Sequence, residues 1–117
     1  MLNENGTLYA EDLWNNYATE SEYNSNNCTI TFNLIAGSNS YGLYLRDGNQ
    51  TLIHHNAFFD NFLTGTSQGY DSTFYSLWYD ILAMEGNYWS NYLVGNYSID
   101  GLSGSHDVYP LLSNPLS

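Results

Sequence analysis

Apolar and polar positions follow the same pattern twice between residues 26 and 61. The segment 29–35 reads Thr-Ile-Thr-Phe-Asn-Leu-Ile, and the segment 52–58 reads Leu-Ile-His-His-Asn-Ala-Phe. A shift of 23 residues superposes the two copies, with Ile30 on Ile53, Asn33 on Asn56, Ile35 on Phe58 and Gly42 on Gly65. Two apolar positions five apart, with Asn two residues before the second, do not fit one face of an ordinary helix. Short strands stacked in successive coils do fit, so the pattern predicts a repeat architecture.

A period of about 23 residues, rich in Asn and Gly and poor in charge, predicts an all-β fold. The expected form is a short right-handed parallel β-helix. Its inner columns would stack Ile30 on Ile53 and Ile35 on Phe58. Asn tolerates the left-handed conformation, and its amide can bond the same amide one coil away. We therefore expect Asn33 and Asn56 to form a polar ladder at one corner.

The 117 residues fit one domain. We divide it into an N-terminal cap or irregular part (1–25), coils (26–85) and a C-terminal cap (86–117). Early acids and apolar spacing predict a short helix over 10–17, within a cap spanning 8–20. An irregular first coil is the alternative. The C-terminal cap is predicted to be aromatic, with Trp89 as its plug. Its expected residues are Tyr88, Trp89, Tyr92, Tyr109 and Pro110.

The strongly negative net charge of the chain disfavours several classes of binding partner. The net charge is −11, with one basic residue against twelve acids, which disfavours nucleic acid and anionic membranes. Aromatic residues make up 17% of the chain, which argues against a disordered acidic tail. No apolar run reaches the length of a membrane span, and residues 1–5 lack the features of a signal peptide. The chain is therefore either cytoplasmic or a mature or excised piece of a longer protein. A Tyr-rich, Lys-free composition favours an extracellular or cell-surface location.

Two sequence features bear on covalent chemistry. The single cysteine, Cys28, excludes an internal disulfide, and we interpret it as a small buried or half-buried side chain. Asn-x-Ser/Thr sequons, the acceptor sites for glycosylation, occur at Asn5, Asn27, Asn49 and Asn96.

Catalytic and metal-binding signals are weak. His54 and His55 are adjacent, and neighbouring side chains on a strand point to opposite faces, so we expect no shared metal. Sugar cleavage needs paired carboxylates, and Arg46 is the only basic side chain that could neutralise a uronate. The candidate acids are Asp47, Asp60, Asp71 and Asp80. No Ser-His-Asp set or phosphate loop is present. We therefore expect neither an enzyme nor a metal site.

The repeats at 41–45 (Tyr-Gly-Leu-Tyr-Leu) and 52–61 resemble those of the NosD-like family of parallel β-helix repeat proteins, which is abundant in archaeal surface proteins. The pairing of 86–92 (Gly-Asn-Tyr-Trp-Ser-Asn-Tyr) with 107–111 (Asp-Val-Tyr-Pro-Leu) is similar to that family's C-terminal end. The resemblance implies a surface-protein β-helix. Family members often carry an acidic insert that looks able to hold calcium. Here the corresponding segment, 93–101, has one acid, so calcium is only a weak cofactor candidate.

These patterns lead to two functional hypotheses. The leading one is a non-catalytic structural or interaction module that associates with itself end to end, in the extreme as a filament. The alternative is a carbohydrate-binding or carbohydrate-processing β-helix whose aromatic side chains stack on sugars. Those aromatic candidates are Tyr41, Tyr44, Tyr70, Tyr75, Trp78, Tyr79, Tyr88, Trp89 and Tyr92.

Overall fold

The computed structural model describes residues 8–9, 28–46, 50–62 and 66–116, and this part of the chain is all-β, without a helix. Its strands are two or three residues long because the chain turns a corner after each one. In chain order they are β1 (Leu8–Tyr9), β2 (Thr29–Thr31), β3 (Leu34–Ala36), β4 (Leu43–Leu45), β5 (Leu52–His54), β6 (Ala57–Phe59), β7 (Gly69–Asp71), β8 (Tyr88–Trp89), β9 (Tyr97–Ser98) and β10 (His106–Asp107).

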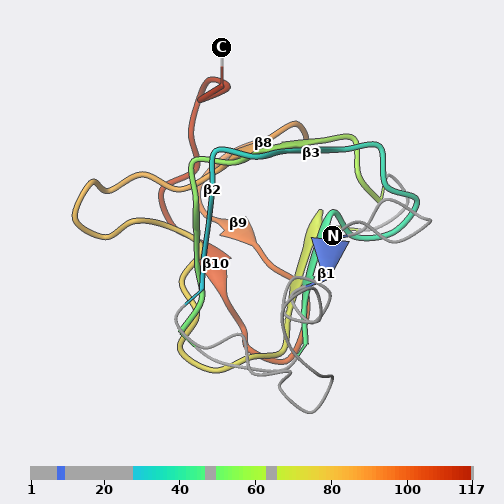
Figure 1. Cartoon of the computed structure of the whole chain (residues 1–117). Helices are drawn as coiled ribbons and strands as arrows, with labels where there is room; N and C mark the ends of the chain where they lie inside the picture. The colour runs from blue at the N-terminus through green and yellow to red at the C-terminus, as the bar shows by residue number, and fades with distance from the viewer. Residues whose placement is uncertain (1–7, 10–27, 47–49, 63–65, 117) are drawn as a thin grey trace.

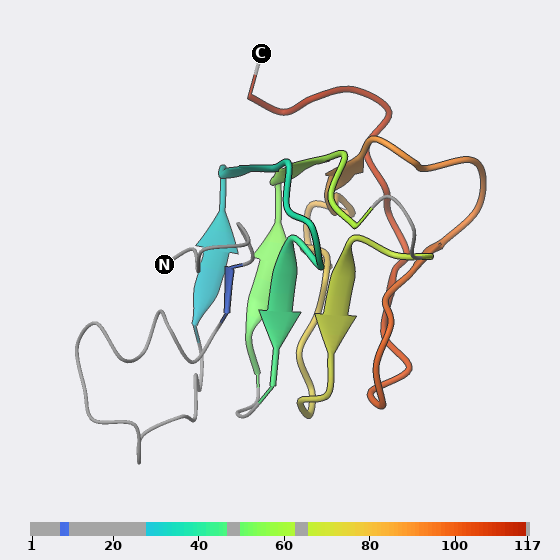
Figure 2. The same ribbon diagram turned by 90° about the vertical axis from the view of Figure 1, so that its right-hand side faces the viewer.

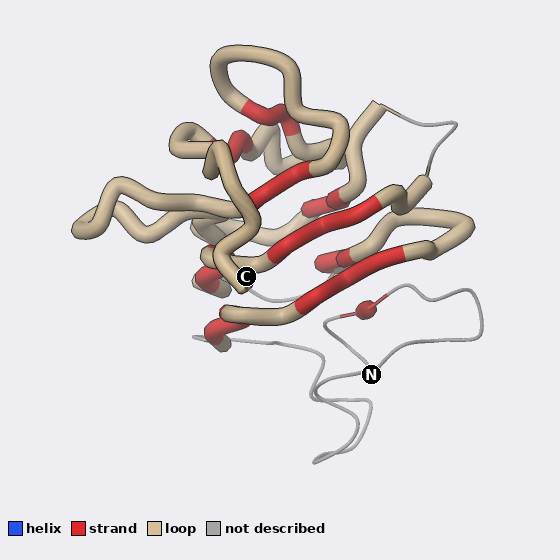
Figure 3. The backbone as a smooth tube through the Cα atoms, turned by 90° about the horizontal axis from the view of Figure 1, so that it is seen from above, coloured by secondary structure: helices blue, strands red, loops and turns tan. Residues whose placement is uncertain are grey.

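Three small parallel sheets lie on three sides of a common interior (Figure 1). They join β2 with β5, β3 with β6 and β8, and β1 with β4 and β7. Figure 2, in which two of these sheets overlap along the line of sight, shows that their strands run in opposite directions, and Figure 3 shows successive levels of strands from above. The predicted register is confirmed on two sides, where Ile30 pairs with Ile53 and Ile35 with Phe58.

The third side departs from the 23-residue shift. Leu43 pairs with Gly69, 26 residues later, so Gly42 lies at the level of Gln68 and not of Gly65. The amide of Gly42 accordingly donates to the Gln68 carbonyl at 2.7 Å. Gly65 itself lies outside the described residues. A longer connection after β6 adds the three extra residues, and this does not disturb the apolar pattern of the strands.

The residue before each corner asparagine has a left-handed backbone. Phe32 and His55 have φ of 55° and 58°, and each comes directly before the corner residue Asn33 or Asn56. The tolerance of Asn for this conformation is thus not used at either corner. The preceding residue makes the bend instead, which lets the buried Asn56 side chain bond the backbone and side chains of neighbouring levels. The same arrangement recurs at Asp60, which has φ of 53° and precedes the buried Asn61.

The interior is a continuous apolar core enclosed by the three sheets. Inward and outward residues alternate along a strand. The first and third residues of β4, Leu43 and Leu45, point inward, whereas in β2 only the middle residue, Ile30, is buried. The core cluster consists of Ile30, Ile35, Leu43, Leu45, Ile53, Phe58, Trp78, Trp89, Tyr97 and Ile99. Trp89 stacks between Phe58 and Tyr97, with ring centroids 4.2 and 4.0 Å away, so it lies inside the core and does not plug its end.

Short strands lie near both ends of the chain. At the N-terminus Leu8–Tyr9 form strand β1, paired in parallel with β4, at the start of the segment for which the sequence predicts a cap or an irregular first coil. The predicted helix over 10–17 lies outside the described residues. At the C-terminus the predicted cap 86–117 begins with β8, which extends the parallel sheet of β3 and β6. It then adds the antiparallel pair of β9 and β10, so the closing elements do not all run parallel.

Candidate functional site

Polar side chains, buried except for Asn33 at the end, form a column at the corner between the β2–β5 and β3–β6–β8 sheets. The backbone and side-chain amides of Asn33 donate to Asn56 Oδ1 at 3.0 and 3.1 Å. Those of Asn56 donate to Asn87 Oδ1 at 3.2 and 3.0 Å. The backbone amide of Asn87 then donates to Asp107 Oδ2 at 2.7 Å. The predicted contact between Asn33 and Asn56 is confirmed, and the column continues two residues further than predicted.

Asn87 and Asp107 are members of this column that the sequence reasoning missed. A sequence signal exists for Asn87, which lies two residues before the core residue Trp89, as Asn56 lies two before Phe58. No repeat signal marks Asp107, because it comes from the antiparallel pair that closes the structure.

The fully buried Asp107 carboxylate joins the polar column to the aromatic core. Its Oδ2 accepts the indole N–H of Trp89 at 2.8 Å, and its Oδ1 accepts the amide of Tyr109 at 3.0 Å. Burial raises the pKa of Asp107, and the hydrogen bonds from Trp89, Asn87 and Tyr109 oppose that rise. A side chain at Gly86 would overlap this carboxylate, so glycine is required there. Asp107 therefore has a structural role that occupies both of its oxygens.

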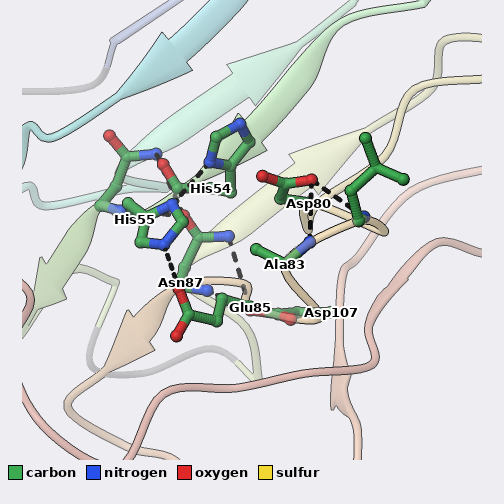
Figure 4. Close-up of polar contacts among 9 residues, drawn as sticks. His54, His55, Asp80, Ala83, Glu85, Asn87 and Asp107 are labelled. Atoms are coloured by element: carbon green, nitrogen blue, oxygen red, sulfur yellow. Dashed lines mark hydrogen bonds and ion pairs between the residues drawn. The ribbon is translucent and has the colours of Figure 1, made fainter.

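Two histidines and a glutamate form a hydrogen-bonded chain on the surface (Figure 4). The Nδ1 atoms of His54 and His55 are 2.7 Å apart, and His55 Nε2 lies 2.6 Å from Glu85 Oε1. The prediction that the two imidazoles point to opposite faces is wrong. Strand β5 ends at His54, and the left-handed backbone of His55 turns its ring toward its neighbour.

The protonation pattern of this chain follows from its geometry. If His55 Nε2 donates to the Glu85 carboxylate, neutral His55 accepts at Nδ1, and His54 must donate from its Nδ1. Burial lowers the pKa of His54, the neighbouring His55 lowers it further, and Asp80 opposes both effects. Within the described part of the chain, no group of three or more His, Cys, Asp or Glu side chains is placed to hold a metal ion.

Two of the four candidate acids for sugar cleavage, Asp71 and Asp80, have structural roles in separate parts of the fold. Asp71 is fully buried and accepts from Thr73 and from the Trp78 indole at 2.8 Å. Asp80 caps the turn of a hairpin by accepting the amide of Leu82 at 3.0 Å. Asp60 is exposed, and Asp47 lies outside the described residues. Asp71 and Asp80 thus bond different partners on different elements.

The predicted aromatic surface divides into inner and outer groups. Trp78 and Trp89 belong to the core, whereas Tyr44 and Tyr70 stack on the outer side of β4 and β7 with centroids 4.3 Å apart. Of the remaining predicted cap residues, Tyr88 packs against Phe59 with ring centroids 5.1 Å apart. Tyr109 packs against Tyr79 with ring centroids 5.4 Å apart. Tyr92 packs partly against the core, and Pro110 is half-buried.

A groove of about 610 Å³ lies between the segment that follows β7 and the loop that joins β9 to β10. The first wall is residues 72–77 with Tyr79, and the second is residues 102–106 with Val108. Phe74 and Tyr75 are 70% and 81% exposed, with ring centroids 6.4 Å apart. Tyr75 and Tyr79 are among the predicted aromatic candidates. Phe74, beside Tyr75 in the first wall, is not among those candidates. The residues of the second wall are not among them either, because only the fold brings the two segments together.

The structure shows the surroundings of the single cysteine and of one glycosylation sequon. Cys28 is half-buried and carries a free thiol, whose pKa is raised by burial. Among the sequons, Asn96 is exposed, and the other three asparagines, at 5, 27 and 49, lie outside the described residues.

Comparison with known proteins does not assign the chain to a family. No family model matches it, and neither a curated protein nor a solved structure is significantly similar to it.

Proposed function

We propose that this chain is a short right-handed parallel β-helix that acts as a non-catalytic structural or interaction module. The observation that carries this proposal is the polar column from Asn33 through Asn56 and Asn87 to Asp107. Stacked side chains at equivalent corners, together with three parallel sheets around one core, are expected of a coiled repeat. The resemblance of its repeats to the NosD-like family is part of the same proposal.

A structural role also agrees with how the buried polar groups are used. Asp71 and Asp107 bind the indole N–H groups of Trp78 and Trp89, and Gln68 binds Asn61, Ser90 and Asn91. Groups committed in this way stabilise the corners, because a buried polar group without a partner is costly. They are not available to activate a substrate.

An extracellular or cell-surface location belongs to the proposal as well. It rests on the Lys-free composition, the abundance of Tyr and the exposed sequon at Asn96. In the described part of the chain there is no helix with the length and apolar character needed to cross a membrane.

The C-terminal end bears on end-to-end assembly. On the outer edge of β8, the Asn87 carbonyl accepts the Leu111 amide at 2.8 Å, and the Trp89 carbonyl accepts the Tyr92 amide at 3.0 Å. A filament that extends the parallel sheet from this edge would have to displace both segments. These contacts favour a module that is closed at this end over a filament built by continuing the ladder.

A screen of neutral and acidic polysaccharides for chain cleavage tests the non-catalytic role. We expect no new reducing ends and no unsaturated products. Cleavage that disappears on substitution of Asp60 or Asp80 would overturn the proposal and favour a carbohydrate-processing β-helix. Wild-type protein and an Asp100→Asn variant, altered at an acid outside that candidate set, should behave alike.

A further inference from the structure

Among the exposed apolar side chains of this acidic chain, two sets are candidates for contact with a partner. One is the groove between residues 72–79 and 102–108. The other is the tip of the hairpin that follows Tyr79, where Ile81, Leu82 and Met84 are 60%, 92% and 61% exposed. We refer to the side chains of residues 81–84 as the apolar tip. Burial of apolar surface is the main favourable term in most protein association, so both features indicate a contact surface.

The hairpin holds the apolar tip in place. The amide of Asp80 donates to the Glu85 carbonyl at 2.8 Å, and the Glu85 amide donates back at 3.2 Å. Asp80 Oδ1 caps the turn, and the Glu85 side chain is tied to His55 (Figure 4). The tip is thus presented on a constrained element, which lowers the entropy lost when it is buried in a contact.

The groove suits an apolar occupant better than a polar one. Its serine and threonine hydroxyls already make hydrogen bonds inside the chain. On the first wall, Ser72 donates to the carbonyls of Leu45 and Arg46, Thr73 donates to the Asp71 carboxylate, and Ser76 shares a hydrogen bond with Thr73. On the second wall, Ser103 donates to Ser105, and Ser105 donates to the Asp71 carboxylate. What the walls offer to a ligand is mainly the side chains of Phe74, Tyr75, Leu77, Leu102 and Val108.

Charge limits which partner can approach. The chain has a net charge of −11, so two copies repel unless their contact is uncharged or screened. No Asp, Glu, Lys or Arg of the described residues lines the groove, and the apolar tip carries none except at its base, where Asp80 and Glu85 lie. A contact between these two features would therefore bring apolar surfaces of two copies together without placing like charges in the groove.

We infer that the apolar tip of one copy docks into the groove of a second copy. This inference deepens the proposed interaction module and rests on it, but it places self-association on the side of the molecule and leaves the closed edge of β8 untouched. The contact joins two different patches, so it is heterologous. Such contacts give closed rings or open chains, unless two copies exchange tips reciprocally and form a dimer.

Sedimentation velocity of the full chain over a range of concentrations tests the docking. We compare wild type with the tip variant Leu82→Asn and the groove variant Phe74→Asn. Each should weaken self-association by about tenfold or more, since removal of a central apolar anchor costs more than about 1.4 kcal/mol. Leu93→Asn is the matched control, because Leu93 is 91% exposed and lies outside both features.

Mixing the two variants gives the decisive result. The tip variant keeps an intact groove and the groove variant keeps an intact tip, so a 1:1 mixture should form a complex that neither forms alone. Met84→Asn and Tyr75→Asn repeat the test if either first variant unfolds by circular dichroism. A wild type that stays monomeric throughout, or a mixture that forms no complex, overturns the docking.

The alternative occupant of the groove is a neutral saccharide. If wild type is monomeric and binds neutral oligosaccharides in a titration that Phe74→Asn abolishes, the groove is a sugar site and the docking is wrong. Either result leaves the non-catalytic proposal standing, because that proposal fails only if polysaccharide is cleaved.

Discussion

At the residue scale, the buried polar side chains have as large a part in the fold as the apolar ones. Asp71 and Asp107 each hold one tryptophan by its indole N–H, so the core and the corners depend on each other. A tryptophan can be fully buried at low cost only if its N–H finds a partner. Substitutions at Trp89, Asp107 and His54 separate the contributions of packing and of charge.

Trp89→Ala should lower the free energy of unfolding by about 3–5 kcal/mol, the range for truncating a large buried aromatic side chain. Trp89 is 1% exposed and stacks between Phe58 and Tyr97. Urea denaturation measures the change. Tyr75→Ala, at an exposed ring, is the control and should cost less than about 1 kcal/mol. A similar small loss for Trp89→Ala would mean that its burial contributes little.

Asp107→Asn should change how stability depends on pH. Burial raises the folded-state pKa of Asp107 above the ordinary value of 3.8. Its contribution is then fully present below pH 3.8 and is lost as the pH rises through the folded pKa. Wild type should therefore lose stability relative to Asp107→Asn as the pH rises from 3.8. Urea denaturation at several pH values tests this, and parallel curves for the two proteins would contradict it.

His54 should give the opposite pH dependence in a different window. Its folded-state pKa lies below the ordinary value of 6.5, mainly through burial. The stability that it contributes is present above pH 6.5 and is lost as the pH falls through the folded pKa. The His54→Gln variant should lose less stability than wild type on acidification. The exposed His106, replaced by Gln, is the control. Equal losses in wild type and His54→Gln would show that the imidazole pair does not limit acid stability.

At the scale of elements, short strands are held by corner residues as much as by their own ladders. A strand of two or three residues offers few backbone bonds, so the side chains between strands must satisfy the remaining groups. Asn56 does this from the middle of the column: it accepts from Asn33 and donates to Asn87 and to the carbonyls of Ile30 and His54.

Asn56→Ala should cost more than about 3 kcal/mol, because it leaves several buried groups unpaired at about 1–3 kcal/mol each. Asn33→Ala is the matched control within the same column. Asn33 is exposed and lies at the end of the column, so its loss should cost about 1 kcal/mol. Thermal or urea denaturation compares them, and equal costs would show that position in the column does not matter.

At the scale of the whole molecule, the core runs unbroken across successive levels. Phe58, Trp89 and Tyr97 stack face to face, although they come from β6, β8 and β9. Contacts of this kind couple the levels, so no part of the described core can open alone without exposing its neighbour. We expect one cooperative unfolding transition. Tryptophan fluorescence and far-ultraviolet circular dichroism should then give the same midpoint, and two separate midpoints would contradict the continuous core.

The sequence by itself determined the register of the first two sheets. Ile30 on Ile53, Ile35 on Phe58 and Asn33 beside Asn56 could be predicted because each level must place like side chains against like in the same environment. That requirement is local and periodic, so it leaves a visible pattern in the chain. The same pattern, two residues before Trp89, would have identified Asn87.

Only the tertiary structure decided the features that bring distant segments together. The 26-residue offset of β7 depends on connection length, which apolar periodicity does not record. Asp107 reaches the column only through the antiparallel closure of β9 and β10, and the groove exists only where residues 72–79 meet 102–108. His54 and His55 meet because the strand ends at His54 and His55 has a left-handed backbone. A strand rule predicted the opposite, since the alternation of side chains holds only while the strand continues.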